Sequence, residues 1–317
     1  MAELTYFNLL NKTLELYLNE EYEKGFNYIM ENKDKVEGNR AQIYNFSYTL
    51  ATKAGFIEQA IELLKEAVLE KGYWYSYDYL LEDEDLDPLR EHKIFDEIKR
   101  VCKERELKAK EQAKPFKKVL TPDNNKKDEK SSLLMALHGN QSNIKIAEKY
   151  WKKALKLNNI VGLIQSSRIE FSDAYAWSDI DLGTEELKTH LKEIKNNYNI
   201  DEDNIILGSF SAGARVILGS INKDYINPRG LILVGPWLPE VDNYDEIYEK
   251  LKEQNIKLYI ICGTKDQDCF EGCNKFVNKL NEYEIKNYYD KIAGLKHDYP
   301  DNFKEKLKSG FDYIRKG

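Results

Sequence analysis

From about residue 131 onwards, continuous apolar runs alternate with stretches in which apolar residues recur every three or four positions. The runs include "SLLMAL", "IVGLIQS", "NIILGS", "GLILVG" and "KLYIICG", and amphipathic stretches such as "TEELKTHLKEIKNNY" separate them. Apolar strands between amphipathic helices are typical of a parallel sheet that is covered on both faces. The pattern predicts an α/β fold, with a doubly wound and mostly parallel sheet over residues 113–317. Functional residues of such sheets follow the carboxyl ends of the strands.

Residues 1–112 show helical periodicity alone. Segments that begin at Tyr22 and Ile57 align with each other and pair Gly25 with Ala60. The offset is near the roughly 34-residue period of tetratricopeptide helix hairpins, in which a small residue lets two helices approach closely. This resemblance predicts an all-α, helical-hairpin domain of tetratricopeptide-like type. It is either an appendage or lid of its neighbour, or a groove for a protein partner. Arrays that bind peptides usually hold three or more repeats, which favours the first interpretation.

The composition excludes several classes of function. The chain has 317 residues, 32% of them charged, and a net charge of −7. An acidic chain without a basic stripe is not expected to bind nucleic acid. No run approaches the roughly 20 apolar residues of a membrane span, and the amino terminus lacks the basic start and apolar block of a secretory signal. The four cysteines are typical of reduced thiols, so we expect a cytoplasmic protein.

A candidate nucleophile lies in "NIILGSFSAGARVIL". Ser211 follows the apolar run and precedes a predicted helix, which would present its hydroxyl on a sharp strand-to-helix turn. Such a turn needs small residues two positions before and after the serine, and the usual pattern is G-x-S-x-G. Gly213 fits this pattern, whereas Ser209 replaces the first glycine. The alternative interpretation is a plain corner between a strand and a helix.

A serine nucleophile needs a base and an acid that orients it. His297, in the loop "AGLKHDYP", is the one histidine that follows Ser211 in the chain, and we expect it to be the base. Asp266 comes shortly after the run "KLYIICG" and is the expected acid, with Asp268 as the alternative. The chain order serine, aspartate, histidine is that of the α/β-hydrolase fold.

The loop "ALHGNQS" offers the last part of such a site. A His-Gly turn after an early strand can direct a backbone N–H towards an oxyanion, together with the N–H of the residue after the nucleophile. This assigns the oxyanion hole to the amides of Asn140 and Ala212, with His138 holding the loop. Cys269 and Cys273 lack the further ligands of a structural zinc site, so no metal is expected there.

Through "LHGN", "FSAG", "GTKD" and "GLKHDYP", residues 113–317 resemble the phospholipase/carboxylesterase branch of the α/β-hydrolases, which includes the acyl-protein thioesterases. The resemblance implies hydrolysis of a small-molecule carboxylic ester or thioester through an acyl-enzyme, without a cofactor. Two departures are Ser209 in place of glycine and the less glycine-rich "HGN". Two alternatives stay open: a serine peptidase of the same fold, and a non-catalytic interaction protein that uses the helical repeats.

Overall fold

The computed structural model describes residues 4–123 and 128–316. The polar segment "TPDNNKKDEK" at 121–130 predicts an exposed loop, and its residues 124–127 lie outside the described residues. Within the described ranges, no helix is both long enough and apolar enough to cross a membrane.

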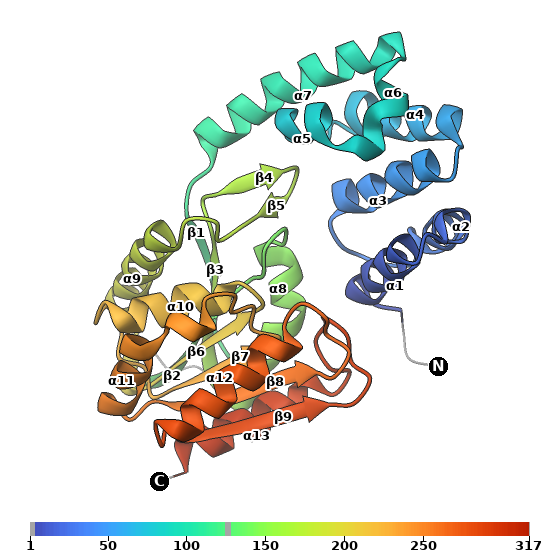
Figure 1. Cartoon of the computed structure of the whole chain (residues 1–317). Helices are drawn as coiled ribbons and strands as arrows, with labels where there is room; N and C mark the ends of the chain where they lie inside the picture. Colours follow the sequence, from blue (N-terminus) through green and yellow to red (C-terminus); the bar gives the residue numbers. More distant parts are fainter. Residues whose placement is uncertain (1–3, 124–127, 317) are drawn as a thin grey trace. The chain divides into compact units, whose positions relative to one another are not determined.

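The chain divides into two compact units (Figure 1). The first, the helical unit, is Met1–Ala113 together with Ile169–Ala174. The second, the sheet unit, is Lys114–Arg168 together with Tyr175–Gly317. The helical unit therefore contains a short piece of chain from the middle of the sequence, whose flanking residues both belong to the sheet unit.

Helices that follow one another along the chain pack together in the helical unit. They are α1 (Tyr6–Leu18), α2 (Tyr22–Asn32), α3 (Arg40–Lys53), α4 (Ile57–Lys65) with the π-helical turn η1 (Glu66–Glu70), α5 (Tyr77–Glu82), η2 (Glu84–Leu86), α6 (Asp87–Arg90) and α7 (Lys93–Gln112). Gly25 of α2 faces α3, and a Cβ atom on it would lie 3.0 Å from Leu50 Cδ2. The small residue at this position therefore allows α2 and α3 to approach closely.

The segment from the middle of the chain is bound to the helical unit through Ser172. It includes β4 (Ile169–Phe171) and the first residue of β5 (Ala174–Tyr175). The Asn39 side chain caps α3 and donates through Nδ2 to the Ser172 carbonyl at 2.9 Å. The Trp74 backbone N–H donates to Ser172 Oγ at 2.8 Å, and the Ser172 N–H donates to the Trp74 carbonyl at 3.1 Å. These three bonds pair the backbone N–H and the backbone carbonyl of both Trp74 and Ser172.

The sheet unit is built on seven strands in the order β1-β3-β2-β6-β7-β8-β9. They are β1 (Phe116–Leu120), β2 (Ser131–Leu137), β3 (Asn159–Gln165), β6 (Ile200–Phe210), β7 (Gly230–Val234), β8 (Lys257–Gly263) and β9 (Asn287–Ile292). Only β1 runs antiparallel to its neighbour, β3. Strands β3, β7 and β8 are buried along their whole length, which explains their continuous apolar runs. The predicted α/β fold with a mostly parallel sheet is confirmed.

Helices cover both faces of this sheet (Figure 1). They are α8 (Ile144–Trp151) with the turn η3 (Lys152–Leu157), α9 (Ile180–Asn197), α10 (Gly213–Asn222), the turn η4 (Val241–Asn243), α11 (Asp245–Glu253), α12 (Phe270–Glu282) and α13 (Phe303–Arg315). Leu207 of β6 shares a core with the apolar sides of α9 to α12. The next residue, Gly208, faces Trp151 of α8, which packs edge-on against Phe303 of α13 at 5.2 Å. Because successive strand residues point to opposite faces, α8 and α13 cover the second face.

Candidate active site

The residues that sequence reasoning selected follow neighbouring strands of the sheet. Strands β2, β6, β7 and β8 are adjacent and parallel, so their carboxyl ends meet at one edge. The register pairs Leu137 with Ser209 and Phe210 with Val234, so the strands end at nearly the same level. The first residues after β2, β6 and β7 at this edge are His138, Ser211 and Gly235.

Ser211 occupies a strained turn between β6 and α10. Its φ is 52°, in the left-handed region that a residue with a Cβ rarely adopts and that costs about 1–3 kcal/mol. Its backbone N–H donates to the Val234 carbonyl at 3.0 Å, and its carbonyl accepts from the Ala214 N–H at 3.2 Å. These two bonds tie the turn to β7 on one side and to the first turn of α10 on the other. The side chain of Ser211 is therefore held at the amino end of a helix, where the dipole favours a developing negative charge.

The two small residues around Ser211, Ser209 and Gly213, have different amounts of space for a side chain. A Cβ on Gly213 would lie 2.8 Å from the His138 carbonyl oxygen and 2.9 Å from Leu137 Cβ, so the loop after β2 leaves room for glycine alone. Ser209 is fully buried, and its Oγ has no hydrogen-bond partner among the described residues. The fold therefore accommodates a serine in place of the usual glycine, at the cost of an unpaired hydroxyl.

Asp266 and His297 form a hydrogen-bonded pair beside this turn. His297 Nδ1 lies 2.7 Å from Asp266 Oδ2, and the Cys269 N–H donates to Asp266 Oδ1 at 3.1 Å. The Asp266 residue is 2% exposed, whereas the Asp268 residue is exposed. With Nδ1 engaged by a buried carboxylate, the His297 ring has Nε2 as its second nitrogen for proton exchange. Of the two aspartates considered, the structure brings only Asp266 to the histidine.

Two contacts of His297 were missed by sequence reasoning. The first is Gly235, with a φ of 47°: a Cβ on it would lie 3.1 Å from Asp266 Oδ2 and 3.3 Å from His297 Nδ1. The second is Phe210, whose ring centroid lies 4.6 Å from that of His297. The Gly-Pro pair directly after an apolar run was the one signal that could have indicated Gly235. Together these contacts place the Asp266–His297 pair against the ends of β6 and β7.

His138 is a buried residue that holds the loop after β2. Its Nε2 accepts the Ser166 N–H at 3.2 Å, its ring stacks on Trp177 with centroids 4.9 Å apart, and its carbonyl accepts from Trp177 Nε1 at 2.7 Å. Burial lowers the pKa of His138 to about 4, so the ring is neutral near neutral pH. His190 of α9 is also buried, with 5% of the residue exposed.

The two expected oxyanion-hole residues belong to chain segments next to Ser211. Ala212 is buried directly after it, at the start of α10. Asn140 follows the His-Gly turn, and its Oδ1 accepts the Trp177 N–H at 2.8 Å. A Cβ on the intervening Gly139 would lie 3.0 Å from Ser211 Cβ, so the backbone of this loop passes close to the serine.

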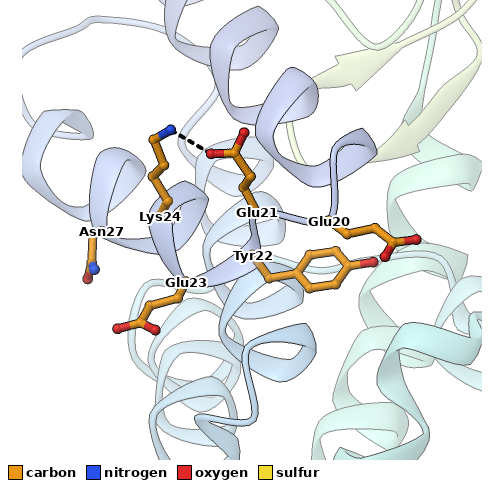
Figure 2. A pocket seen from close by; sticks show the side chains of 6 residues that line it. All are labelled: Glu20, Glu21, Tyr22, Glu23, Lys24 and Asn27. Atoms are coloured by element: carbon orange, nitrogen blue, oxygen red, sulfur yellow. Dashed lines mark hydrogen bonds and ion pairs between the residues drawn. The ribbon is translucent and has the colours of Figure 1, made fainter.

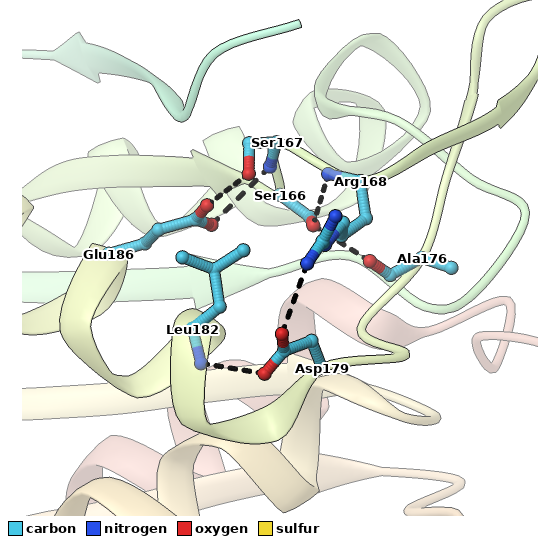
Figure 3. Close-up of polar contacts among 7 residues, drawn as sticks. All are labelled: Ser166, Ser167, Arg168, Ala176, Asp179, Leu182 and Glu186. Atoms are coloured by element: carbon cyan, nitrogen blue, oxygen red, sulfur yellow. Dashed lines mark hydrogen bonds and ion pairs between the residues drawn. The ribbon is translucent and has the colours of Figure 1, made fainter. Parts of the chain in front are cut away.

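A polar network fixes the chain before and after the segment that joins the helical unit (Figure 3). Ser167 Oγ donates to the carboxylate of Glu186, a residue that is 5% exposed and whose pKa is raised by burial. Ser166 Oγ donates to the Ala176 carbonyl at 2.7 Å, and Arg168 pairs with Asp179 at 3.1 Å. Because Trp177 follows Ala176, the network also fixes the chain next to Trp177, the residue that stacks on His138.

A separate hollow lies at the α1–α2 turn of the helical unit (Figure 2). It is lined by Glu20, Glu21, Tyr22, Glu23, Lys24 and Asn27. Lys24 Nζ pairs with Glu21 Oε2 at 2.5 Å, and Tyr22 packs against Tyr17 with ring centroids 5.6 Å apart. This hollow contains no serine, cysteine or histidine, so it offers no nucleophile–base pair.

The comparisons with known proteins cover both units. Residues 5–110 match a family model described as "A/B hydrolase-like, N-terminal domain". An uncharacterized protein from Bacillus cereus ATCC 10987, known from a crystal structure, shares 43% sequence identity with this chain. The match covers 99% of this chain and 100% of that chain, with a TM-score of 0.57. The chain therefore has the α/β-hydrolase fold, and its helical unit matches the N-terminal domain of that hydrolase-like family model. The tetratricopeptide-like character of the helices stays a prediction.

More distant structures share the fold of this chain. Esterase PE8 is 14% identical, with 62% of this chain and 97% of that chain covered and a TM-score of 0.52. Est1E from Butyrivibrio proteoclasticus is 12% identical, with 64% and 93% covered and a TM-score of 0.50. Identities this low establish the fold alone. No protein with a curated description matches the sequence of this chain.

Proposed function

We propose that this protein is a serine esterase or thioesterase that cleaves a small-molecule substrate through an acyl-enzyme on Ser211. The observation that carries the proposal is the 2.7 Å hydrogen bond between the buried Asp266 and the half-buried His297, at the sheet edge where Ser211 adopts a φ of 52°. The reaction needs a nucleophile, a base and an acid that orients the base. These three residues supply them.

The chemistry follows from the roles of these groups. His297 Nε2 takes the proton of the Ser211 hydroxyl as Oγ attacks the acyl carbon, and Asp266 stabilises the imidazolium that forms. The imidazolium returns its proton to the leaving alcohol or thiol as the tetrahedral intermediate collapses to the acyl-enzyme. His297 then deprotonates a water molecule that attacks the acyl-enzyme, and the acid leaves with Ser211 regenerated.

The oxyanion is assigned to two backbone amides. The N–H of Ala212 stands at the first turn of α10, and the N–H of Asn140 belongs to the loop that passes close to Ser211. Donors in these positions act on negative charge that develops on the substrate oxygen, which is the usual source of the largest rate effect in acyl transfer. No metal or cofactor takes part in this scheme.

Esters and thioesters are the proposed substrates on two grounds. The motifs around Ser211, Asp266 and His297 resemble the phospholipase/carboxylesterase branch. PE8, a structure of the same fold, is named as an esterase. We further propose a cytoplasmic location, in line with four cysteines that form no disulfide in the structure. The helical unit acts as a lid, a packing element or the site of a protein partner.

The proposal is tested by labelling the intact protein with a fluorophosphonate and mapping the modified residue. The expected result is one adduct on Ser211, no adduct on Ser211→Ala, and unchanged labelling of Ser209→Ala, because Ser209 is fully buried. Labelling at another serine, or none in a folded protein, would refute the assignment. A comparison of the turnover of p-nitrophenyl esters with the turnover of peptide amides then distinguishes an esterase from a peptidase.

A further inference from the structure

A third group accompanies the Asp266–His297 pair. Cys269 precedes α12, and its Sγ lies 3.6 Å from His297 Nδ1, the nitrogen that also bonds Asp266. The carboxylate oxygen, the thiol sulfur and the ring nitrogen all lie within 4.8 Å of one another. Nothing in the hydrolysis derived above uses a thiol at this position.

These three groups are the ligand types of zinc. Zn²⁺ binds thiolate at about 2.3 Å, imidazole nitrogen at about 2.0–2.1 Å and carboxylate oxygen at about 2.0–2.2 Å, in tetrahedral geometry. Those bond lengths place a sulfur and a nitrogen ligand about 3.6 Å apart, which matches the 3.6 Å between Cys269 and His297. A nitrogen and an oxygen ligand would be about 3.4 Å apart, so the Asp266–His297 contact would have to open from 2.7 Å.

We propose that Asp266, Cys269 and His297 form an inhibitory site for a thiophilic divalent cation such as Zn²⁺. The cation replaces the proton between His297 Nδ1 and Asp266, and the Cys269 thiol gives up its proton to bind as a thiolate. Two protons leave the site and no oxidation occurs. A water molecule supplies the fourth ligand of the tetrahedral site.

The consequence for catalysis rests on the proposed function. An imidazole that binds a cation through Nδ1 cannot be stabilised as an imidazolium by Asp266, so Ser211 loses its base. Chelation of the cation restores the hydrogen bond and the activity. The site would thus act as a reversible switch on the hydrolase.

The neighbouring thiols provide a matched control. Cys262 and Cys273 share a buried cluster with Cys269, but their sulfurs face the carbonyls of Gly263 at 3.7 Å and Pro236 at 3.6 Å. Neither faces His297. A Cys273→Ser variant therefore changes the same cluster without removing a proposed ligand.

The experiment uses the full-length protein, first treated with a chelator. Co²⁺ titration should give a thiolate-to-cobalt charge-transfer band with one equivalent bound, and Zn²⁺ should displace it. The Cys269→Ser variant should lose the band and bind Zn²⁺ at least about 10-fold more weakly, as measured by competition with a chromophoric chelator. Cys273→Ser should keep both properties.

Two results would overturn the proposal. One is the absence of the band in the unsubstituted protein, a result that does not depend on any variant. The other is a band that survives Cys269→Ser and disappears in Cys273→Ser. The metal titrations measure binding of Co²⁺ and Zn²⁺ in the absence of substrate. Fluorophosphonate labelling of the metal-free protein measures the reactivity of Ser211. The two proposals therefore fail independently. Inhibition by Zn²⁺ is expressed relative to the metal-free rate of each protein.

Discussion

The imidazole of His297 lies against the phenyl ring of Phe210, with ring centroids 4.6 Å apart. Phe210 is the last residue of β6, so Ser211 follows it directly. Phe210 also contacts Tyr299, which stacks on it with ring centroids 4.6 Å apart and comes two residues after His297. The loop with the proposed base is thus packed on the strand that carries the proposed nucleophile. Such packing fixes the reacting groups before substrate binds.

The first prediction concerns the backbone at Ser211. Ser211→Ala and Ser211→Gly should both lower kcat by about 10⁴-fold or more, because each removes the nucleophile. They should differ in stability. Glycine adopts a φ of 52° without the strain of a Cβ, so Ser211→Gly should unfold with a free energy up to about 1 kcal/mol higher than Ser211→Ala. Activity assays and thermal unfolding of the pair measure the two effects.

Equal stability of the alanine and glycine variants would mean that the turn relaxes once the hydroxyl is gone. Residual activity within tenfold of the unsubstituted protein would exclude Ser211 as the nucleophile.

The second prediction separates the two aspartates. Asp266→Asn should lower kcat by about 10⁴-fold, since the amide favours the wrong imidazole tautomer and leaves the imidazolium without a partner. Asp268 is exposed, so Asp268→Asn should leave kcat nearly unchanged. Steady-state kinetics of both variants on one activated ester make the comparison. A larger loss at position 268 would contradict the Asp266–His297 pairing.

Much of the candidate site could be predicted because its residues have local signals in the sequence. Ser211 and Asp266 each follow a continuous apolar run, and the carboxyl ends of parallel strands must meet. His297 was selected by elimination among four histidines. These inferences use only the period of the pattern and the order of the residues.

The remaining features depend on contacts between distant parts of the chain. The hydrogen bonds of Ser172 with Asn39 and Trp74 join a segment inside the sheet region to the helical unit, and nothing in "FSDAY" indicates them. The position of Cys269 beside His297 depends on how α12 begins after β8. A single sequence carries no signal for such approaches.

The third prediction tests the space around Gly235. Gly235→Ala should lower kcat by up to about 100-fold, because the added Cβ would lie 3.1 Å from Asp266 Oδ2 and 3.3 Å from His297 Nδ1 and displace the pair. Gly55→Ala is the matched control: its φ is also positive, at 80°, but a Cβ there meets nothing within 4 Å. Both variants should lose some stability, and only Gly235→Ala should lose activity. If Gly235→Ala and Gly55→Ala have the same kcat, contact of the added Cβ with the Asp266–His297 pair does not account for any loss of activity.

The fourth prediction concerns the helical unit. A chain that begins at Ala113 keeps every proposed catalytic residue but loses Asn39 and Trp74, the partners of Ser172. We expect it to be less stable, with kcat on p-nitrophenyl acetate changed little. If the helical unit acts as a lid, turnover of long or bulky esters should change more than turnover of this small ester. Kinetics over an ester series of increasing size measure this.

Asn39→Asp in the full-length chain separates the loss of one bond from the loss of the unit. Aspartate keeps the oxygen that caps α3 but cannot donate to the Ser172 carbonyl, so only the link to the inserted segment is weakened. If this variant reproduces the altered preference for bulky esters, the preference is set through the Ile169–Ala174 segment. A soluble, folded chain from Ala113 without activity on any small ester would instead show that the helical unit supplies part of the active site. The division at residues 112 and 113 would then have to be abandoned.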